Sequence, residues 1–190
     1  MKELLIYTFV ECDLSTATST ILVIKNKTKS LVYVHLGTNK AVLLKKTQQV
    51  FSKLSNKGII YQLKDESRLS SSAKKDIMHI RNQYLSILNN ERKEGNIKYE
   101  YITGTEFQKS VWDELSKIEN GNTTTYGKIA QNIGKPKAVR AVGKACGGNK
   151  LAIVLPCHRV LGSSGMATGF AFGCAMKEEL LAREDVFLKK

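Results

Sequence analysis

Short segments rich in β-branched and aromatic residues lie in the first half of the chain, and this pattern predicts β-strands. They are Leu4–Val10, Thr20–Lys25 and Leu31–Leu36. The polar residues 26–30 predict a turn between the last two, so we expect an antiparallel hairpin and a third strand. Gly58 then opens a further short strand over residues 59–63.

Helical periodicity follows in the same half of the chain. Apolar residues recur at steps of three and four over residues 39–54, with lysines on the outer face, which predicts an amphipathic helix. A second helix is expected after Ser70–Ser72, with one apolar stripe formed by Ile77, Ile80, Tyr84, Leu85 and Leu88. His35 and His79 lie among core-type neighbours, and we interpret both as structural histidines.

The second half predicts a series of shorter helices. Thr105 is a plausible N-cap for a helix whose buried stripe is Phe107, Val111, Trp112, Leu115 and Ile118. A helix over residues 126–133 is expected to end at Gly134, and Pro136 is suited to begin the next one, over residues 137–146. Two short helices joined through a glycine form a helix-turn-helix pattern, although helical hairpins also occur in proteins that bind no DNA. A last helix is expected over Met176–Glu184.

Length and patterning indicate an α+β protein of two domains. A polar stretch, residues 89–102, separates the strand-rich half from the helical half. We therefore expect an N-terminal α/β domain over residues 1–95 with a small antiparallel sheet, a linker over 96–103, and a C-terminal domain over 104–190.

Charge narrows the choice of partner. Lysine and arginine number 30 against 17 acidic residues, a formal net charge of +13, so a polyanion such as nucleic acid is the natural partner. A generally lysine-rich composition is the alternative. Four cysteines without CxxC spacing favour reduced thiols and predict neither a disulfide framework nor a metal site. No long apolar run or signal-peptide pattern is present, so we expect an intracellular protein that does not interact with membranes.

One thiol stands out for its neighbours. Cys157 and His158 follow Pro156 and the apolar run Leu151–Leu155. Because the thiolate is the nucleophilic form of cysteine and an adjacent imidazole favours it, the pair indicates a reactive thiol. The alternative is a buried structural cysteine beside a histidine that bonds a carbonyl, and the two residues alone leave both open.

The expected helix over residues 137–146 has few large side chains. Small residues dominate its sequence, and Arg140 is the one arginine on it that can reach outward. This composition fits a helix laid against DNA with an arginine entering the duplex. Tight packing against another helix, with a solvated arginine, explains it equally well.

Several motifs in this order resemble the O6-alkylguanine-DNA alkyltransferase family. They are Pro156-Cys157-His158-Arg159-Val160, Tyr126-Gly127-x-Ile129-Ala130, Gly134-x-Pro136-x-Ala138-x-Arg140-Ala141-Val142-Gly143, Asn149, and Lys177 through Leu180-Leu181-x-x-Glu184. The resemblance covers about residues 104–184, and the first nine residues also resemble fungal members. It implies a ribonuclease H-like N-terminal domain and a winged-helix-like C-terminal domain that holds the helix-turn-helix.

The same resemblance implies the chemistry. The family moves an alkyl group, without a cofactor, from O6-alkylguanine in DNA to a cysteine that is not regenerated, and O4-alkylthymine is a candidate second substrate. It implies Cys157 as acceptor and His158 as general base through water, oriented by Glu184. The remaining catalytic roles it implies are Asn149 in the same network, Tyr126 as proton donor to the leaving guanine and Lys177 as support.

The family's mode of DNA binding implies further residues. By this resemblance the protein would enter double-stranded DNA from the minor groove, largely without regard to sequence, and would rotate the damaged base out while Arg140 fills the gap. The DNA-binding face would add Ala138, Ala141, Gly143, Cys146 and Tyr126, and the pocket Pro156, Val160, Gly169, Phe170 and Ala171. Phe170 and Ala171 depart from the family pattern, where a tyrosine and, in some members, a serine stand. The inferred DNA substrate implies a protein of the nucleus, with the cytoplasm as a second location, and we expect a monomer.

Two other functions compete with alkyl transfer. A lesion-binding module without chemistry is disfavoured by the presence of Cys157. A cysteine hydrolase built on Cys157, His158 and Glu184 is disfavoured because no oxyanion motif is evident.

Overall fold

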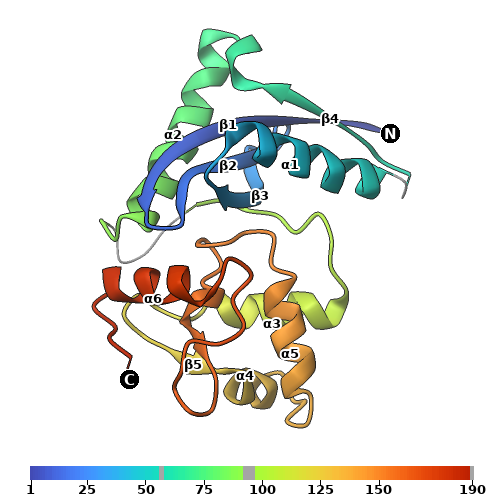
Figure 1. The fold of residues 1–190 in the computed structure, drawn as a ribbon. Coiled ribbons are helices and arrows are strands. Elements are labelled where there is room, and N and C mark those ends of the chain that lie inside the picture. The colour runs from blue at the N-terminus through green and yellow to red at the C-terminus, as the bar shows by residue number, and fades with distance from the viewer. Residues whose placement is uncertain (56–57, 92–96, 189–190) are drawn as a thin grey trace. The chain divides into compact units, whose positions relative to one another are not determined.

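The computed structural model describes residues 1–55, 58–91 and 97–188, and it has a mixed α+β fold (Figure 1). The chain divides into two compact units. Unit 1 comprises Met1–Leu85 with Asn96–Thr103, and unit 2 comprises Ser86–Gly95 with Gly104–Lys190. No helix among the described residues combines the length and the hydropathy needed to cross a membrane.

Unit 1 is built on a four-stranded sheet with the order β3-β2-β1-β4. Its strands are β1 (Lys2–Leu14), β2 (Ala17–Lys25), β3 (Ser30–Gly37) and β4 (Ile60–Asp65). The hairpin and third strand are confirmed as antiparallel pairs, but β4 runs parallel to β1, so the expectation of an antiparallel sheet was wrong. The reason is the helix between β3 and β4, which returns the chain to the end of the sheet where β3 began.

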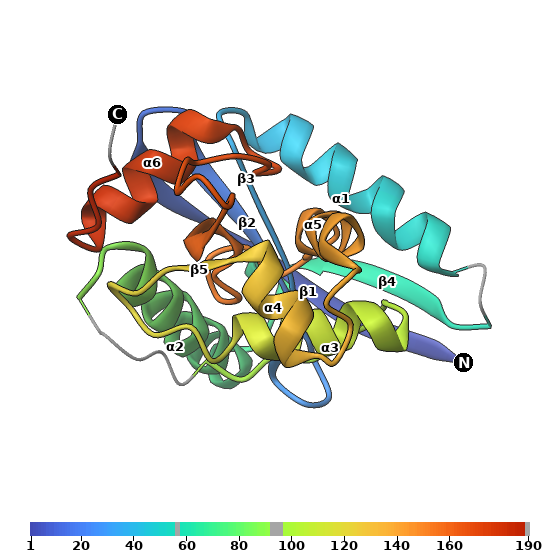
Figure 2. The same ribbon diagram turned by 90° about the horizontal axis from the view of Figure 1, so that it is seen from below.

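Two helices supply the rest of the unit 1 core. They are α1 (Lys40–Ser55) and α2 (Ser71–Leu88), drawn in Figure 2, and both confirm the expected amphipathic helices. Leu43 and Phe51 of α1 pack with alternate residues of β2, among them Ile21, whereas Tyr84 of α2 lies beside Thr20 on the opposite face of that strand. Because both faces of β2 are covered, all four residues of its central run, 21–24, are fully buried.

The two histidines of unit 1 differ from the expectation of core residues. His79 is exposed on α2, because the buried stripe of that helix runs through Ile77 and Ile80 and leaves the two positions between them on the outer side. His35 is half-buried on β3 and stacks on Tyr33, with the ring centroids 6.1 Å apart.

The segment that follows the first domain is paired with the sheet. Leu31 on the edge strand β3 donates to the carbonyl of Lys98 at 2.8 Å and accepts from the backbone of Glu100 at 3.0 Å. Residues 97–103 therefore belong to unit 1, whereas a linker was expected over 96–103. Part of that expected linker, and the end of the expected first domain, fall on residues 92–96, outside the described residues.

Unit 2 holds four helices and a two-stranded parallel pair among its described residues. The helices are α3 (Glu106–Leu115), α4 (Tyr126–Asn132), α5 (Val139–Gly147) and α6 (Cys174–Arg183), and the strands are β5 (Thr124–Thr125) and β6 (Val160–Leu161). Thr105 caps α3 as predicted, and Gln108 completes a capping box with it. Trp112 is buried, and its indole N–H donates to the carbonyl of Ala145 in α5 at 2.8 Å, which ties α3 to α5.

The turn between α4 and α5 confirms the helix-turn-helix pattern in outline. Gly134 has a φ of +70°, and the backbone N–H of Lys135 reaches the carbonyl of Ala130 at 2.8 Å, which closes α4 as the glycine predicted. The next helix begins at Val139, later than the expected start at Lys137, because residues 135–138 form a turn closed by the N–H of Ala138 on the carbonyl of Lys135.

Candidate functional site

A short 3-10 turn, η2 (Cys157–Arg159), carries the candidate thiol and imidazole in unit 2. The turn before it is held by Asn149, whose side chain accepts from the N–H of Leu151 at 2.8 Å and donates to the carbonyl of Leu155 at 2.9 Å. Ile153 inside this turn has a φ of +75°, a strained conformation for a β-branched residue. The apolar run 151–155 is therefore a buried turn, and it fixes the position of Cys157 directly after it.

Cys157 is buried, with 7% of the residue exposed. Asn149 Nδ2 donates to Cys157 Sγ at 3.3 Å, as the expected network requires. Burial raises the pKa of the Cys157 thiol, and the Asn149 hydrogen bond and the charge of Lys177 offset this only in part. The thiol is thus protonated at neutral pH in the free protein and needs a base before it can attack.

His158 lies beside the thiol and is almost completely buried. Its Nε2 lies 2.8 Å from Oε1 of Glu184, the residue that caps the C-terminal end of α6. Burial lowers the pKa of His158, with Glu184 acting against that change, so the ring is neutral at pH 7. Because Nε2 faces a carboxylate, the proton sits on Nε2, and the buried Nδ1, which has no hydrogen-bond partner, is free to accept one.

Arg159 completes the cluster, and sequence analysis assigned it no role. Its Nε donates to Glu184 Oε2 at 2.8 Å and its Nη2 to Glu184 Oε1 at 2.9 Å. Burial alone would raise the pKa of Glu184, but the hydrogen bonds from His158 and Arg159 lower it to about 2. The sequence did offer a signal for a buried, paired arginine, because Arg159 is a charged residue followed directly by the apolar Val160 and Leu161.

A second cluster lies around Lys177 near the start of α6. Lys177 is fully buried, and its Nζ donates to the carbonyls of Val160 and Thr168. The hydroxyl of Tyr126, at the first position of α4, donates to the same Thr168 carbonyl at 3.0 Å, and Lys177 Nζ lies 5.7 Å from the centroid of its ring. Burial raises the pKa of Tyr126 to about 12, and burial lowers that of Lys177. Thr168 takes part through its backbone, so its side-chain type gave no sequence signal.

The expected pocket residues fall into two groups. Pro156 and Val160 are buried and frame the turn that holds Cys157. Gly169, by contrast, is exposed on the loop before α6, with a φ of +66°, and a Cβ there would lie 3.1 Å from the Tyr126 hydroxyl, so glycine permits the close approach. In the same loop Phe170 is half-buried and tilts against Phe172, while Ala171 is exposed.

The residues expected at the DNA face lie mainly on α5. Arg140 and Ala141 are exposed, and Ala138 and Gly143 are half-buried. Cys146, also expected at the DNA face, is only 4% exposed in the free protein; it lies on the inner side of α5, where burial raises its pKa to about 12. The helix periodicity explains this, because Val142 and Ala145 define the buried face that Cys146 also joins.

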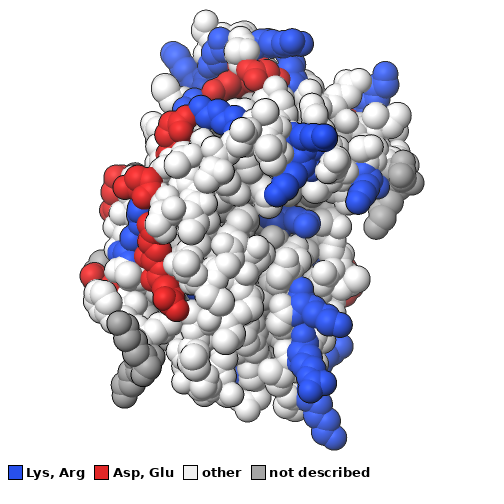
Figure 3. All heavy atoms as spheres, in the orientation of Figure 1, with Lys and Arg blue, Asp and Glu red and all other residues white. Residues whose placement is uncertain are grey.

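Residues 120–177 contain no acidic side chain and eight basic ones. This stretch includes α4, the turn, and α5, and Lys128, Lys135, Lys137, Arg140 and Lys144 in it are exposed. Basic side chains are seen over α5 in the space-filling view (Figure 3). A surface of one charge sign along a helix-turn-helix is suited to the phosphates of nucleic acid.

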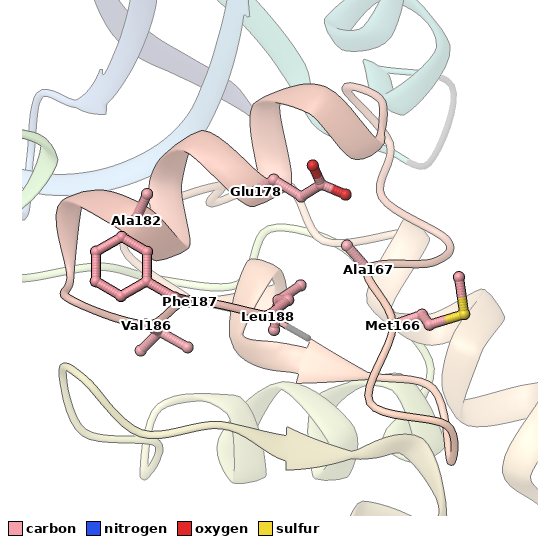
Figure 4. A pocket seen from close by; sticks show the side chains of 7 residues that line it. All are labelled: Met166, Ala167, Glu178, Ala182, Val186, Phe187 and Leu188. Carbon is pink, nitrogen blue, oxygen red and sulfur yellow. The ribbon is translucent and has the colours of Figure 1, made fainter. Parts of the chain in front are cut away.

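A separate pocket of about 310 Å³ lies beside α6. Glu178 and Ala182 of α6, Met166 and Ala167 of the preceding loop, and residues 186–188 line it, as Figure 4 shows. It includes none of the residues around Cys157, so the pocket does not serve that thiol. No group of three or more potential ligand side chains that could hold a metal ion occurs in the parts of the chain described above.

Comparison with known proteins places this geometry among DNA repair proteins. The family described as "6-O-methylguanine DNA methyltransferase, DNA binding domain" matches residues 106–186. Proteins named methylated-DNA–protein-cysteine methyltransferase from Saccharomyces cerevisiae and Kluyveromyces lactis are 42% and 43% identical, covering 97% of this chain and 95% and 98% of theirs. The crystal structure of Mycobacterium tuberculosis OGT in complex with DNA is 28% identical, with a TM-score of 0.67 and coverage of 94% of this chain and 92% of that one.

Proposed function

We infer the function from one premise: the chain belongs to the methylated-DNA–protein-cysteine methyltransferase family, with relatives 42–43% identical over nearly its whole length. It is a methyltransferase of direct-reversal DNA repair, which moves a methyl group from DNA to a cysteine of the protein itself. We propose that Cys157 is that cysteine. The carrying observation is a buried thiol, held by Asn149, next to a histidine with one nitrogen locked by Glu184 and the other without a partner.

Transfer from O6-methylguanine forms one bond and breaks one. The Cys157 sulfur lone pair attacks the methyl carbon, a carbon–sulfur bond forms, and the bond from that carbon to O6 breaks with its electron pair left on the guanine. The product is a thioether at Cys157 and an unmodified guanine. Because no group in the site cleaves a thioether, each protein molecule acts once, and the reaction needs no cofactor because the substrate supplies the alkyl group.

The proton moves in step with these bonds. His158 accepts the thiol proton at its unpartnered Nδ1, through a water molecule, while Glu184 stabilises the imidazolium that results. Negative charge builds on the leaving guanine, which takes a proton from the Tyr126 hydroxyl; solvent then returns a proton to the tyrosine as His158 releases the one it took from Cys157. Tyr126 now donates to the Thr168 carbonyl, so the entering base must take over that hydrogen bond, while Lys177 keeps the carbonyl in place.

The proposed DNA contact uses α5. The damaged base leaves the stack from the minor groove, and the exposed Arg140 occupies the space that it vacates. The surface without acidic residues binds phosphates, so affinity falls steeply with salt and depends little on sequence. We further propose that the protein acts as a monomer in the nucleus, and also in the cytoplasm, that O4-alkylthymine is a second substrate, and that units 1 and 2 are of ribonuclease H-like and winged-helix type.

A stoichiometric transfer assay tests the proposed function. The protein is incubated with a duplex that carries one O6-methylguanine labelled on the methyl carbon. Label should appear on Cys157, identified by peptide mass spectrometry, with one label per protein molecule even in excess DNA. Multiple turnover, label on another residue, or lesion binding without transfer would each reject the assignment.

Replacement of Arg140 by alanine should separate base flipping from chemistry. We expect Arg140→Ala to slow transfer from duplex O6-methylguanine by about tenfold or more, because the few kcal/mol needed to unstack a base are then uncompensated. Attack on free O6-benzylguanine, which needs no flipping, should change less than twofold, by the same reasoning.

Lys144→Ala is the matched control for Arg140→Ala, because this exposed lysine lies one turn further along α5. It should weaken binding to damaged and undamaged duplex alike and reduce the salt dependence by about one phosphate contact. If Arg140→Ala lowers the rate of transfer equally from the duplex and from free O6-benzylguanine, the proposed role of Arg140 in base flipping is rejected.

A further inference from the structure

Arg159 is a charged residue in the buried interior of unit 2. The residue is 7% exposed, and all three of its terminal nitrogens have acceptors: Nε and Nη2 bond the two oxygens of Glu184, and Nη1 bonds the carbonyl of Ile118 just after α3. A buried guanidinium is costly unless it is paired in this way. Burial of Arg159 therefore depends on its hydrogen bonds to Glu184 and to the Ile118 carbonyl.

The carboxylate of Glu184 is shared between two donors. Its Oε1 receives both His158 Nε2 at 2.8 Å and Arg159 Nη2 at 2.9 Å, while Oε2 receives Arg159 Nε alone. The two parallel bonds from arginine fix the plane of the carboxylate, which histidine alone cannot do through one atom. The orientation of the imidazole, and of its free Nδ1, therefore depends on the arginine.

We propose that Arg159 is a positioning residue for alkyl transfer: its two-point pairing with Glu184 fixes the carboxylate on Nε2 of His158 and keeps Nδ1 unprotonated and ready to accept the thiol proton. The inference rests on the proposed function of Cys157. It adds that the base is set by three groups, a histidine, a carboxylate and a guanidinium, of which the first and last belong to one 3-10 turn.

The charges around His158 explain why the guanidinium is needed. Glu184 favours the protonated ring, whereas Arg159 and Lys177 disfavour it, and the Cys157 thiol is the remaining titratable neighbour on the turn. Without Arg159, a buried carboxylate would face His158 with its charge unbalanced. The imidazole would then take a proton to neutralise it, and a protonated ring cannot act as a base.

The test is the pH dependence of single-turnover transfer from duplex O6-methylguanine, measured between pH 5.5 and 9 with the full chain. For Arg159→Gln we expect the midpoint of the rising limb to move up by about one pH unit or more, because a positive charge within hydrogen-bonding distance of the pair has been removed. Arg159→Lys keeps the positive charge but cannot make two parallel hydrogen bonds to Glu184. The midpoint of its pH profile should therefore stay near that of the wild type, while its plateau rate falls several-fold.

Arg183→Gln is the matched control, since Arg183 on α6 pairs with Glu179 at 3.3 Å and lies next to Glu184 in sequence. Its profile should match that of the wild type. An unshifted midpoint in Arg159→Gln, or an equal shift in Arg183→Gln, would overturn the inference. If Arg159→Gln does not fold, wild-type rates for Arg159→Lys at every pH would overturn it. A wild-type protein that transfers nothing would instead reject the proposed function.

Discussion

Cys157→Ala is expected to end alkyl transfer altogether, with no label on the protein after prolonged incubation with a duplex that carries labelled O6-methylguanine. The Cys157 sulfur is the nucleophile that attacks the methyl carbon, whereas the other groups of the proposed site hold or move protons. Binding of the lesion should persist, since the α5 surface is untouched and the variant loses only a small atom at a position with 7% exposure. Affinity is measured by titration of a fluorescent duplex with and without the lesion.

Cys146→Ala is the matched control for that result. Cys146 is also a buried thiol in the same unit, and burial raises its pKa to about 12, so it remains protonated and has no assigned base. Transfer by Cys146→Ala should therefore stay within about twofold of the wild type. The substitution removes one sulfur atom and leaves all the reacting groups in place. Label on Cys146 in the Cys157→Ala protein would contradict the assignment of a single acceptor.

Glu184→Gln is expected to lower the free energy of unfolding at pH 7 by about 3 kcal/mol or more, because it leaves the buried Arg159 without its counter-charge. The pKa of Glu184 is about 2 in the folded protein against an ordinary value of 4.5. A carboxyl whose pKa is depressed by folding stabilises the protein above the unfolded-state pKa, and this contribution is lost as pH falls. The difference between wild type and variant should therefore shrink between about pH 4.5 and pH 2, and urea unfolding followed by circular dichroism at several pH values measures it.

Glu179→Gln supplies the comparison on the same helix. Glu179 pairs with Arg183 four residues away, at about a quarter exposure on both side chains, and such partly exposed pairs contribute roughly 0.5 kcal/mol or less. Equal losses for the two variants, or a Glu184→Gln difference that stays constant from pH 7 to pH 3, would show that the buried cluster does not hold unit 2 together as described.

The elements that the sequence predicted are those with local signals. Thr105 and Gly134 fix the ends of α3 and α4 through backbone contacts within six residues, so their chemistry could be recognised directly. The parallel pairing of β4 with β1 joins residues nearly sixty positions apart, and nothing local encodes its direction. The exposure of His79 depends on which face of α2 meets the sheet, which is likewise a tertiary choice.

The site shows the same division. Cys157 and His158 are neighbours in the sequence, and their motif made them candidates. The contacts that Arg159 makes with Glu184, twenty-five positions away, and the carbonyl of Thr168 that Tyr126 and Lys177 share, arise only when the chain folds. Cys146 lies on the buried face of α5 with Val142 and Ala145, and which face of a helix is buried is again decided by tertiary packing.

Trp112 offers a spectroscopic consequence of how unit 2 is packed. It is the single tryptophan of the chain, it is 3% exposed, and its ring lies so close to Gly104 that a Cβ there would fall 2.5 Å from it. Its indole N–H is bonded to α5, the helix that carries Arg140. Indole emission therefore reports the environment of unit 2 alone, while unit 1 contributes only tyrosine. Fluorescence and far-ultraviolet dichroism, recorded on one sample, can thus follow the helical DNA-binding part and the whole chain as separate signals.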